Sequence, residues 1–65
     1  MNSSEKFPVK VGLGTLDKKM TRAAAHRYGV KNMPADLRRA GFQTVVAKTD
    51  IDLHGGVWLR INYGK

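Results

Sequence analysis

The feature that most constrains the fold of this chain is the alternation of apolar and polar residues on both sides of Gly55-Gly56. Such a period of two is typical of strands with one buried face, so residues 47–53 and 57–63 are expected to form a hairpin. A three-residue turn over residues 54–56 pairs Leu53 with Val57 and places the apolar residues on one face and the polar residues on the other. A two-residue glycine turn would mix apolar and polar residues on both faces. With that turn, the apolar face also pairs Ile51 with Leu59, Thr49 with Ile61 and Ala47 with Tyr63, and the polar face pairs Asp52 with Trp58, Asp50 with Arg60 and Lys48 with Asn62.

A further strand is expected near the start of the chain, where apolar residues alternate with other residues from Phe7 to Leu13. Because proline has no N–H group to donate to a neighbouring strand, Pro8 favours a place at the edge of the sheet. The polar residues 1–6 are expected to form a flexible tail, and residues 7–65 a single domain, because so short a chain supports only one small core.

Two helices are expected between these strands. Residues 16–28 have a helical spacing of apolar residues, with Thr15 as the N-cap and Gly29 as the C-terminal stop. Asn32 can cap a second, shorter helix that ends before Gly41. The sequence therefore predicts an α+β fold of order β-α-α-β-β, with two short helices on one face of a small antiparallel sheet. The expected core comprises Val9, Val11, Leu13, Leu16, Met20, Leu37, Val45, Ile51, Leu59 and Ile61.

The net charge is concentrated in one part of the chain. Residues 18–39 hold seven basic residues and only one acidic residue, Asp36, which accounts for +6 of the formal net charge of +7. A charge so concentrated can steer a polyanion onto one face, and nucleic acid, with DNA favoured over RNA, is the expected partner. The other interpretation is a solvated helix face with no ligand. The candidate nucleic-acid-binding residues are Lys18, Lys19, Arg22, His26, Asn32, Arg38, Arg39, Lys48, Trp58 and Arg60.

Residues 21–40 contain a spacing that is typical of two helices packed at a steep angle. Small residues at Thr21 and Ala25 precede a turn glycine, Gly29, and the β-branched Val30. In this spacing the chain resembles the helix-turn-helix family, and the hairpin that follows is similar to the wing of a small, excisionase-type winged-helix domain. The resemblance implies a second helix in the major groove, a wing on the DNA backbone, and contacts to bases or phosphates from Asn32, Ala35, Arg38 and Arg39.

Trp58 is expected on the polar face of the hairpin, beside Arg60 and diagonal to Lys48. An aromatic ring flanked by cations suits stacking on an unpaired base or packing against a protein. The other interpretation is that Trp58 belongs to the core, as most tryptophans do.

Catalysis and membrane attachment are not expected. Asp50, Asp52 and His54 share one face of a strand, but no activated nucleophile or further metal ligand accompanies them, so we expect neither an enzyme, nor a metal site, nor a cofactor. There is no cysteine and no apolar run of the roughly 20 residues that span a bilayer, and the start lacks a signal-peptide pattern. These features predict a cytoplasmic protein.

Two classes of function remain. The first is a small DNA-binding regulator or recombination accessory factor that binds through its basic helical face. The second is an inhibitor or adaptor, of the kind found in mobile elements, that blocks a larger host protein or nucleoprotein complex and adds a strand to it through residues 7–13. In either class a homodimer would enlarge the small core.

Overall fold

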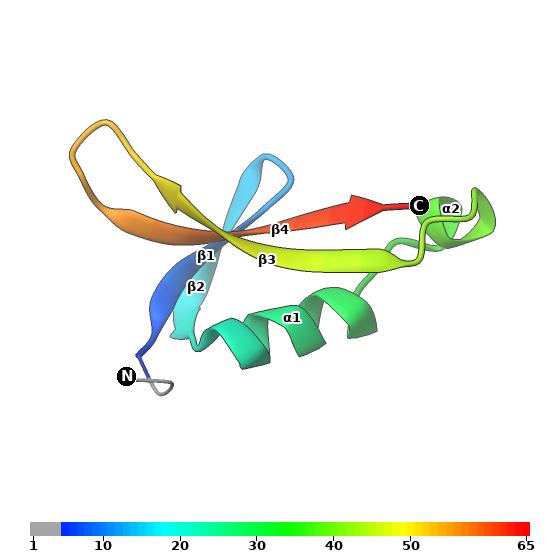
Figure 1. Ribbon diagram of the computed structural model, residues 1–65, viewed down its shortest axis with the longest axis horizontal. Helices are drawn as coiled ribbons and strands as arrows, with labels where there is room; N and C mark the ends of the chain where they lie inside the picture. Colours follow the sequence, from blue (N-terminus) through cyan, green and yellow to red (C-terminus); the bar gives the residue numbers. More distant parts are fainter. Residues whose placement is uncertain (1–4) are drawn as a thin grey trace.

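The computed structural model describes residues 5–65 and shows an α+β fold in which a helix packs on a four-stranded sheet (Figure 1). The order is β-β-α-α-β-β rather than the expected β-α-α-β-β. Of the predicted tail, residues 1–4 lie outside the described residues, and Glu5 and Lys6 are exposed and without regular structure. The elements are β1 (Phe7–Val11), β2 (Gly14–Met20), α1 (Arg22–Lys31), α2 (Ala35–Arg39), β3 (Thr44–Ile51) and β4 (Val57–Gly64).

The sheet consists of two hairpins joined through their inner strands. Its strand order is β2-β1-β4-β3, and β1 pairs with β4 in parallel while the two hairpins pair internally in the antiparallel sense. The expectation of an antiparallel sheet is therefore correct for the hairpins and wrong for the central pair. Val9 and Leu59 face each other across this pair and are both 0 % exposed, so the junction of the two hairpins is the centre of the core.

The helix predicted over residues 16–28 is wrong in its first half, because residues 14–20 form β2. The turn between β1 and β2 contains two residues, Gly12 and Leu13, and Gly12 has φ +59°. Glycine with a positive φ at the first central position is typical of a type II′ hairpin turn. Because this turn reverses the chain, residues 14–20 lie beside β1 and form backbone hydrogen bonds with it. A helix over the same residues would leave β1 without these bonds.

The expectation that β1 is an edge strand is also wrong, since β1 lies between β2 and β4. Pro8 is tolerated because its pairing is incomplete: it faces Lys19 of β2, whereas pairing with β4 begins only at Val9. The register with β2 also shifts between Pro8 and Lys10. Proline therefore occupies the one-sided, irregular start of an otherwise interior strand.

Helix α1 begins after Thr21, whose hydroxyl accepts a hydrogen bond from the backbone N–H of Ala24 at 3.1 Å. Thr21 rather than Thr15 is thus the N-cap. Gly29 lies inside the helix and is buried, so its interpretation as a C-terminal stop is wrong. Asn32 is the C-cap of α1 rather than the N-cap of α2, and its side-chain amide donates to the carbonyl of Tyr28 at 2.9 Å.

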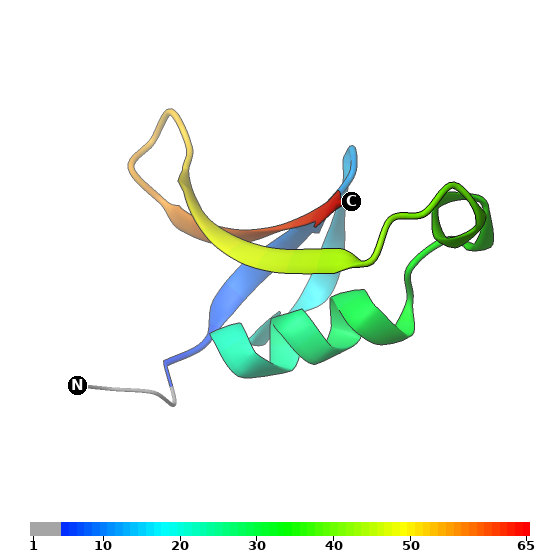
Figure 2. The same cartoon turned by 45° about the vertical axis from the view of Figure 1, so that its right-hand side comes forward.

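Only α1 covers the sheet, contrary to the expectation of two helices on one face. Helix α2 has five residues, none of them buried, and lies beyond the ends of β3 and β4 (Figures 1 and 2). Asp36 in its first turn, Arg38 and Arg39 in its last turn and Gly41 just beyond it agree with the expected arrangement.

The β3–β4 hairpin is present with the expected faces but a different register. Ile51 pairs with Val57 and Thr49 with Leu59, a shift of two positions from the predicted pairs. A shift of two preserves which face each residue occupies, and for this reason the pattern of alternation does not reveal it. The turn comprises residues 53–55 rather than 54–56.

The core is smaller than predicted. Leu13, at the tip of the β1–β2 hairpin, is 109 % exposed and Ile51 is 66 % exposed, so both were wrongly assigned to it. Val11, Leu16 and Leu37 are only partly buried. The buried residues are Val9, Met20, Ala25, Val45, Ala47, Leu59 and Ile61.

Candidate nucleic-acid interface

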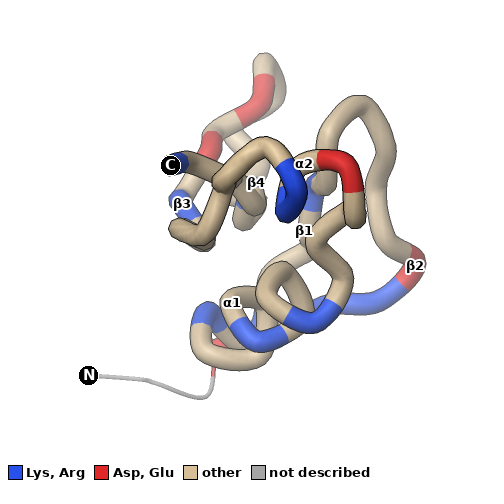
Figure 3. The backbone as a smooth tube through the Cα atoms, turned by 90° about the vertical axis from the view of Figure 1, so that its right-hand side faces the viewer, with Lys and Arg blue, Asp and Glu red and all other residues tan. Residues whose placement is uncertain are grey.

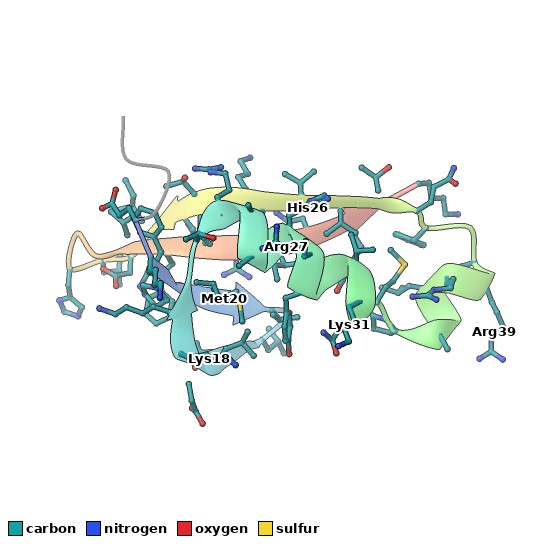
Figure 4. All side chains as sticks on the ribbon, turned by 90° about the horizontal axis from the view of Figure 1, so that it is seen from below. Lys18, Met20, His26, Arg27, Lys31 and Arg39 are labelled. Carbon is teal, nitrogen blue, oxygen red and sulfur yellow. The ribbon has the colours of Figure 1, made fainter. Side chains whose placement is uncertain are left out.

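An open depression lies between the edge strand β2 and helix α1. Its volume is about 570 Å³. Cations line it together with the apolar residues Met20, Ala24 and Tyr28. Figure 4 labels four of the lining residues, Lys18, Met20, Arg27 and Lys31. We call this the β2–α1 groove. The cations that line it are Lys6, Lys18, Lys19, Arg27 and Lys31.

Two consecutive lysines of β2, Lys18 and Lys19, line the groove next to an irregularity in the strand. Successive side chains of a regular strand point to opposite faces. Here Pro8 faces Lys19 and Lys10 faces Thr15, so residues 16–18 of β2 stand opposite the single residue Val9. Such a bulge changes the direction of nearby side chains, and Lys18 and Lys19 line the groove beside it.

The basic surface continues along α1 to α2. Arg27 and Lys31 are four residues apart and therefore neighbours on one side of the helix. Lys31 also lines a second depression of about 410 Å³, together with Met33, Ala35 and the two arginines of α2. We call the two depressions together the basic face; its cations are Lys6, Lys18, Lys19, Arg27, Lys31, Arg38 and Arg39.

Few carboxylates lie near the cations of the basic face to neutralise them. No Asp or Glu lines either depression. Within residues 5–65, the ion pairs join only Asp50 to Lys10 and to Arg60, and neither cation belongs to the basic face. Figure 3 shows the basic positions along α1 and the adjacent part of β2. This face thus presents a positive field to the solvent.

Arg22 and His26, predicted to accompany Lys18 and Lys19, lie on the other side of α1. The Arg22 guanidinium donates to the carbonyl of Ala47 at 3.0 Å and to the Thr49 hydroxyl at 2.6 Å. His26 follows four residues later and lies beside β3 (Figure 4). Arg22 therefore satisfies acceptors along the free edge of β3.

The three hairpin residues that were predicted to bind, Lys48, Trp58 and Arg60, lie on the sheet face that no helix covers. Lys48 and Arg60 are cross-strand neighbours. Arg60 is bound to Asp50 at 3.2 Å, and its guanidinium donates to the carbonyl of Gly12 at 3.2 Å. Lys10 Nζ lies 4.8 Å from the centre of the Trp58 ring. Arg60 and Trp58 thus already have partners within the protein, whereas Lys48 is exposed.

Asp52 organises the β3–β4 turn. Its Oδ1 atom accepts the backbone N–H groups of His54 and Gly56, each at 2.8 Å, and its Oδ2 accepts the Trp58 indole N–H at 2.9 Å. The bond from Trp58, followed by those from Gly56 and His54, holds the pKa of Asp52 below its ordinary value. The predicted cross-strand pair of Asp52 with Trp58 is wrong, since Asp50 stands opposite Trp58 and Asp52 contacts the indole diagonally.

Helix α1 is attached to the sheet at its C-terminal half by Tyr63. The phenol O–H donates to the carbonyl of Gly29 at 3.0 Å. Burial raises the pKa of Tyr63 above its ordinary value, and the neighbouring Tyr28 adds to the rise. Tyr28, which lines the β2–α1 groove, and Tyr63 both pack against the hydrophobic core.

The sequence-based candidates are divided among several places. Lys18, Lys19, Arg38 and Arg39 belong to the basic face, whereas Asn32 is committed to capping α1. Sequence reasoning missed Lys6, Arg27 and Lys31. The signal that could have found the last two is Thr21 as a helix start, because a helix from residue 22 places them on one side.

No protein-family model, curated protein or solved structure matches this chain. Among residues 5–65, no helix is long and apolar enough to cross a membrane. The same residues contain no group of three or more His, Asp or Glu side chains arranged to hold a metal ion.

Proposed function

We propose that this protein binds nucleic acid, in the first place DNA, through the basic face. The observation that carries the proposal is a set of cations gathered from β2, α1 and α2 with no carboxylate lining the surface between them. Phosphates are the ligands that such a surface attracts, through charge and release of counterions. A regulator or recombination accessory factor would use binding of this kind.

The proposal does not depend on α2 acting as a recognition helix. Five residues of helix extend over only about 7.5 Å, and the arginines of α2 adjoin the groove through Lys31. We therefore assign Arg38 and Arg39 to phosphate contacts at one end of the basic face. Contacts with phosphates fix the position of a protein on nucleic acid and read no sequence by themselves.

A pair of charge reversals tests the proposal. Arg27→Glu alters the centre of the basic face, and Lys48→Glu makes the same charge change on the uncovered sheet face. Both side chains are exposed, so neither change should unfold the domain. Affinity for a labelled oligonucleotide at low salt should fall at least about 10-fold for Arg27→Glu and less than about 3-fold for Lys48→Glu.

Equal losses in the two variants would show that net charge alone determines binding, and a larger loss in Lys48→Glu would place the site on the uncovered face. Absence of binding to both single-stranded and duplex DNA by the wild-type protein would refute the proposal.

A different observation favours the second candidate function, docking on a larger protein. Leu13 and Leu53 are 109 % and 101 % exposed at the tips of the two hairpins, on the side of the sheet away from α1 (Figures 1 and 2). Exposed leucines at such tips suit insertion into an apolar partner. Addition of a strand through residues 7–11 is not open to it, because β1 is already paired on both sides.

Leu13→Ser combined with Leu53→Ser tests this candidate by affinity capture from cell extract treated with nuclease. Loss of one stoichiometric protein partner in the double variant would support it. Retention of that partner would contradict it.

A further inference from the structure

The β2–α1 groove combines two chemical characters that a phosphate-binding surface alone does not require. Its margin is cationic, but its floor is apolar and is formed by the side chains of Met20, Ala24 and Tyr28. Met20 is buried and packs in the core, whereas Tyr28 packs against the core and is only partly buried. A ligand that fills the groove must therefore offer both an anion and a flat apolar group.

We propose that the β2–α1 groove binds single-stranded nucleic acid, with one base stacked on Tyr28 and the adjoining phosphates held by the surrounding cations. This inference rests on the proposed function and specifies its ligand. Stacking of bases on aromatic side chains beside a positively charged track is the common mode of single-strand binding, and it tolerates any base because every base has a π-face.

A duplex would contact the cations of the groove but not its apolar lining. Its bases are paired and stacked inside, so a duplex lying across the groove would bring phosphates to the lysines and leave the apolar floor uncovered. A single strand has free base faces and a backbone flexible enough to enter a depression. The charges also favour a strand that follows the groove, since Lys18 and Lys19 contribute from β2 and Arg27 and Lys31 from α1.

Hydrogen bonds at the end of α1 hold the backbone of Tyr28 in position. Its backbone carbonyl accepts both the backbone N–H and the side-chain amide of Asn32, each at 2.9 Å, which holds the end of the helical turn in place. Tyr63 is bonded to α1 at the next residue, through the carbonyl of Gly29. The backbone of Tyr28 is therefore fixed next to a point where α1 is attached to the sheet.

The test compares a 12-nucleotide oligothymidylate with a 12-base-pair duplex at one salt concentration, using fluorescence anisotropy and the variants Tyr28→Leu and Tyr28→Phe. Wild type should bind the single strand more tightly. Tyr28→Leu should weaken single-strand binding by about 5- to 100-fold, the loss expected for one stacked base, and change duplex binding by less than about 2-fold. Tyr28→Phe should retain the wild-type preference, because phenylalanine keeps the ring.

Equal or tighter duplex binding by the wild type, or equal losses for both ligands in Tyr28→Leu, would overturn the inference while leaving the proposed function intact. If neither ligand binds the wild-type protein, the proposed function itself fails. Photocrosslinking needs no variant and so avoids any effect on folding. A 5-iodouracil base in the oligothymidylate should crosslink to Tyr28 of the wild type, and a crosslink to Trp58 instead would place the strand on the uncovered face.

Discussion

Gly29 lies so close to Val45 that a Cβ atom at position 29 would stand 2.7 Å from Val45 Cγ1. The same Cβ would stand 2.8 Å from Cγ2 of Ile61. Both neighbours are buried and branched close to the backbone, so they have little freedom to move. Helix α1 can rest directly on β3 and β4 only because residue 29 has no side chain.

Gly29→Ala should therefore destabilise the protein, although alanine is the better helix former. Relief of the clash requires a shift in the core that costs about 1–3 kcal/mol, against a gain of about 1 kcal/mol in helix propensity. We expect a net loss of about 1 kcal/mol in the free energy of unfolding, measured by urea denaturation. In a Val45→Ala background the same change should be less harmful or neutral, and an unchanged penalty there would contradict the close packing.

Gly55 should be the glycine whose backbone conformation the β3–β4 turn requires. It has φ +80°, whereas Gly56 is not among the glycines with positive φ. Gly55→Val should cost about 1 kcal/mol or more, because a β-branched side chain is strained in that region, while Gly55→Asn should cost less. Thermal unfolding measures both variants, and equal stability of Gly55→Val and the wild type would contradict the turn.

Asp52 should make the stability of the hairpin sensitive to acid. Its pKa is lower in the folded state than in the unfolded chain, where it is close to 3.8. The folded protein therefore binds fewer protons, so the stabilisation is complete above about pH 5 and is lost as the pH falls through the folded-state pKa. Asp52→Asn should reduce stability at pH 7 and flatten its dependence below about pH 4. Denaturation at several pH values measures this, and parallel curves for the two proteins would contradict the assignment.

Arg22 should contribute to stability rather than to binding. Arg22→Ala removes hydrogen bonds to Ala47 and Thr49 and leaves the edge of β3 open, at an expected cost of about 1 kcal/mol. Oligonucleotide affinity of the folded variant should change less than about 3-fold, in contrast to Arg27→Glu. A large loss of affinity with unchanged melting temperature would return Arg22 to the binding surface.

The local pattern of the sequence predicted the C-terminal hairpin and its two faces but not its register. The faces follow from alternation, which a shift of two positions leaves intact. The parallel contact of Val9 with Leu59 joins residues fifty positions apart, and nothing local indicates it. The helical spacing around Leu16 and Met20 favours a helix, but the turn at Gly12 reverses the chain and pairs residues 14–20 with β1.

The candidate site was predictable in its charge and not in its shape. Of the seven basic residues between positions 18 and 39, all but Arg22 belong to the basic face. Lys6 joins them because β1 begins beside the end of β2, where Phe7 faces Met20. The bulge beside Lys18 and Lys19 depends on strand pairing and has no signature in the residues themselves.

The salt dependence of oligothymidylate affinity tests the central claim most directly. Contact with about four to six phosphates predicts a slope of log K against log salt of about −3 to −4 for a single strand. Arg27→Gln should make that slope less steep by about 0.7, while Lys48→Gln should leave it unchanged. A wild-type slope near zero, or a slope altered by Lys48→Gln and not by Arg27→Gln, would contradict the account.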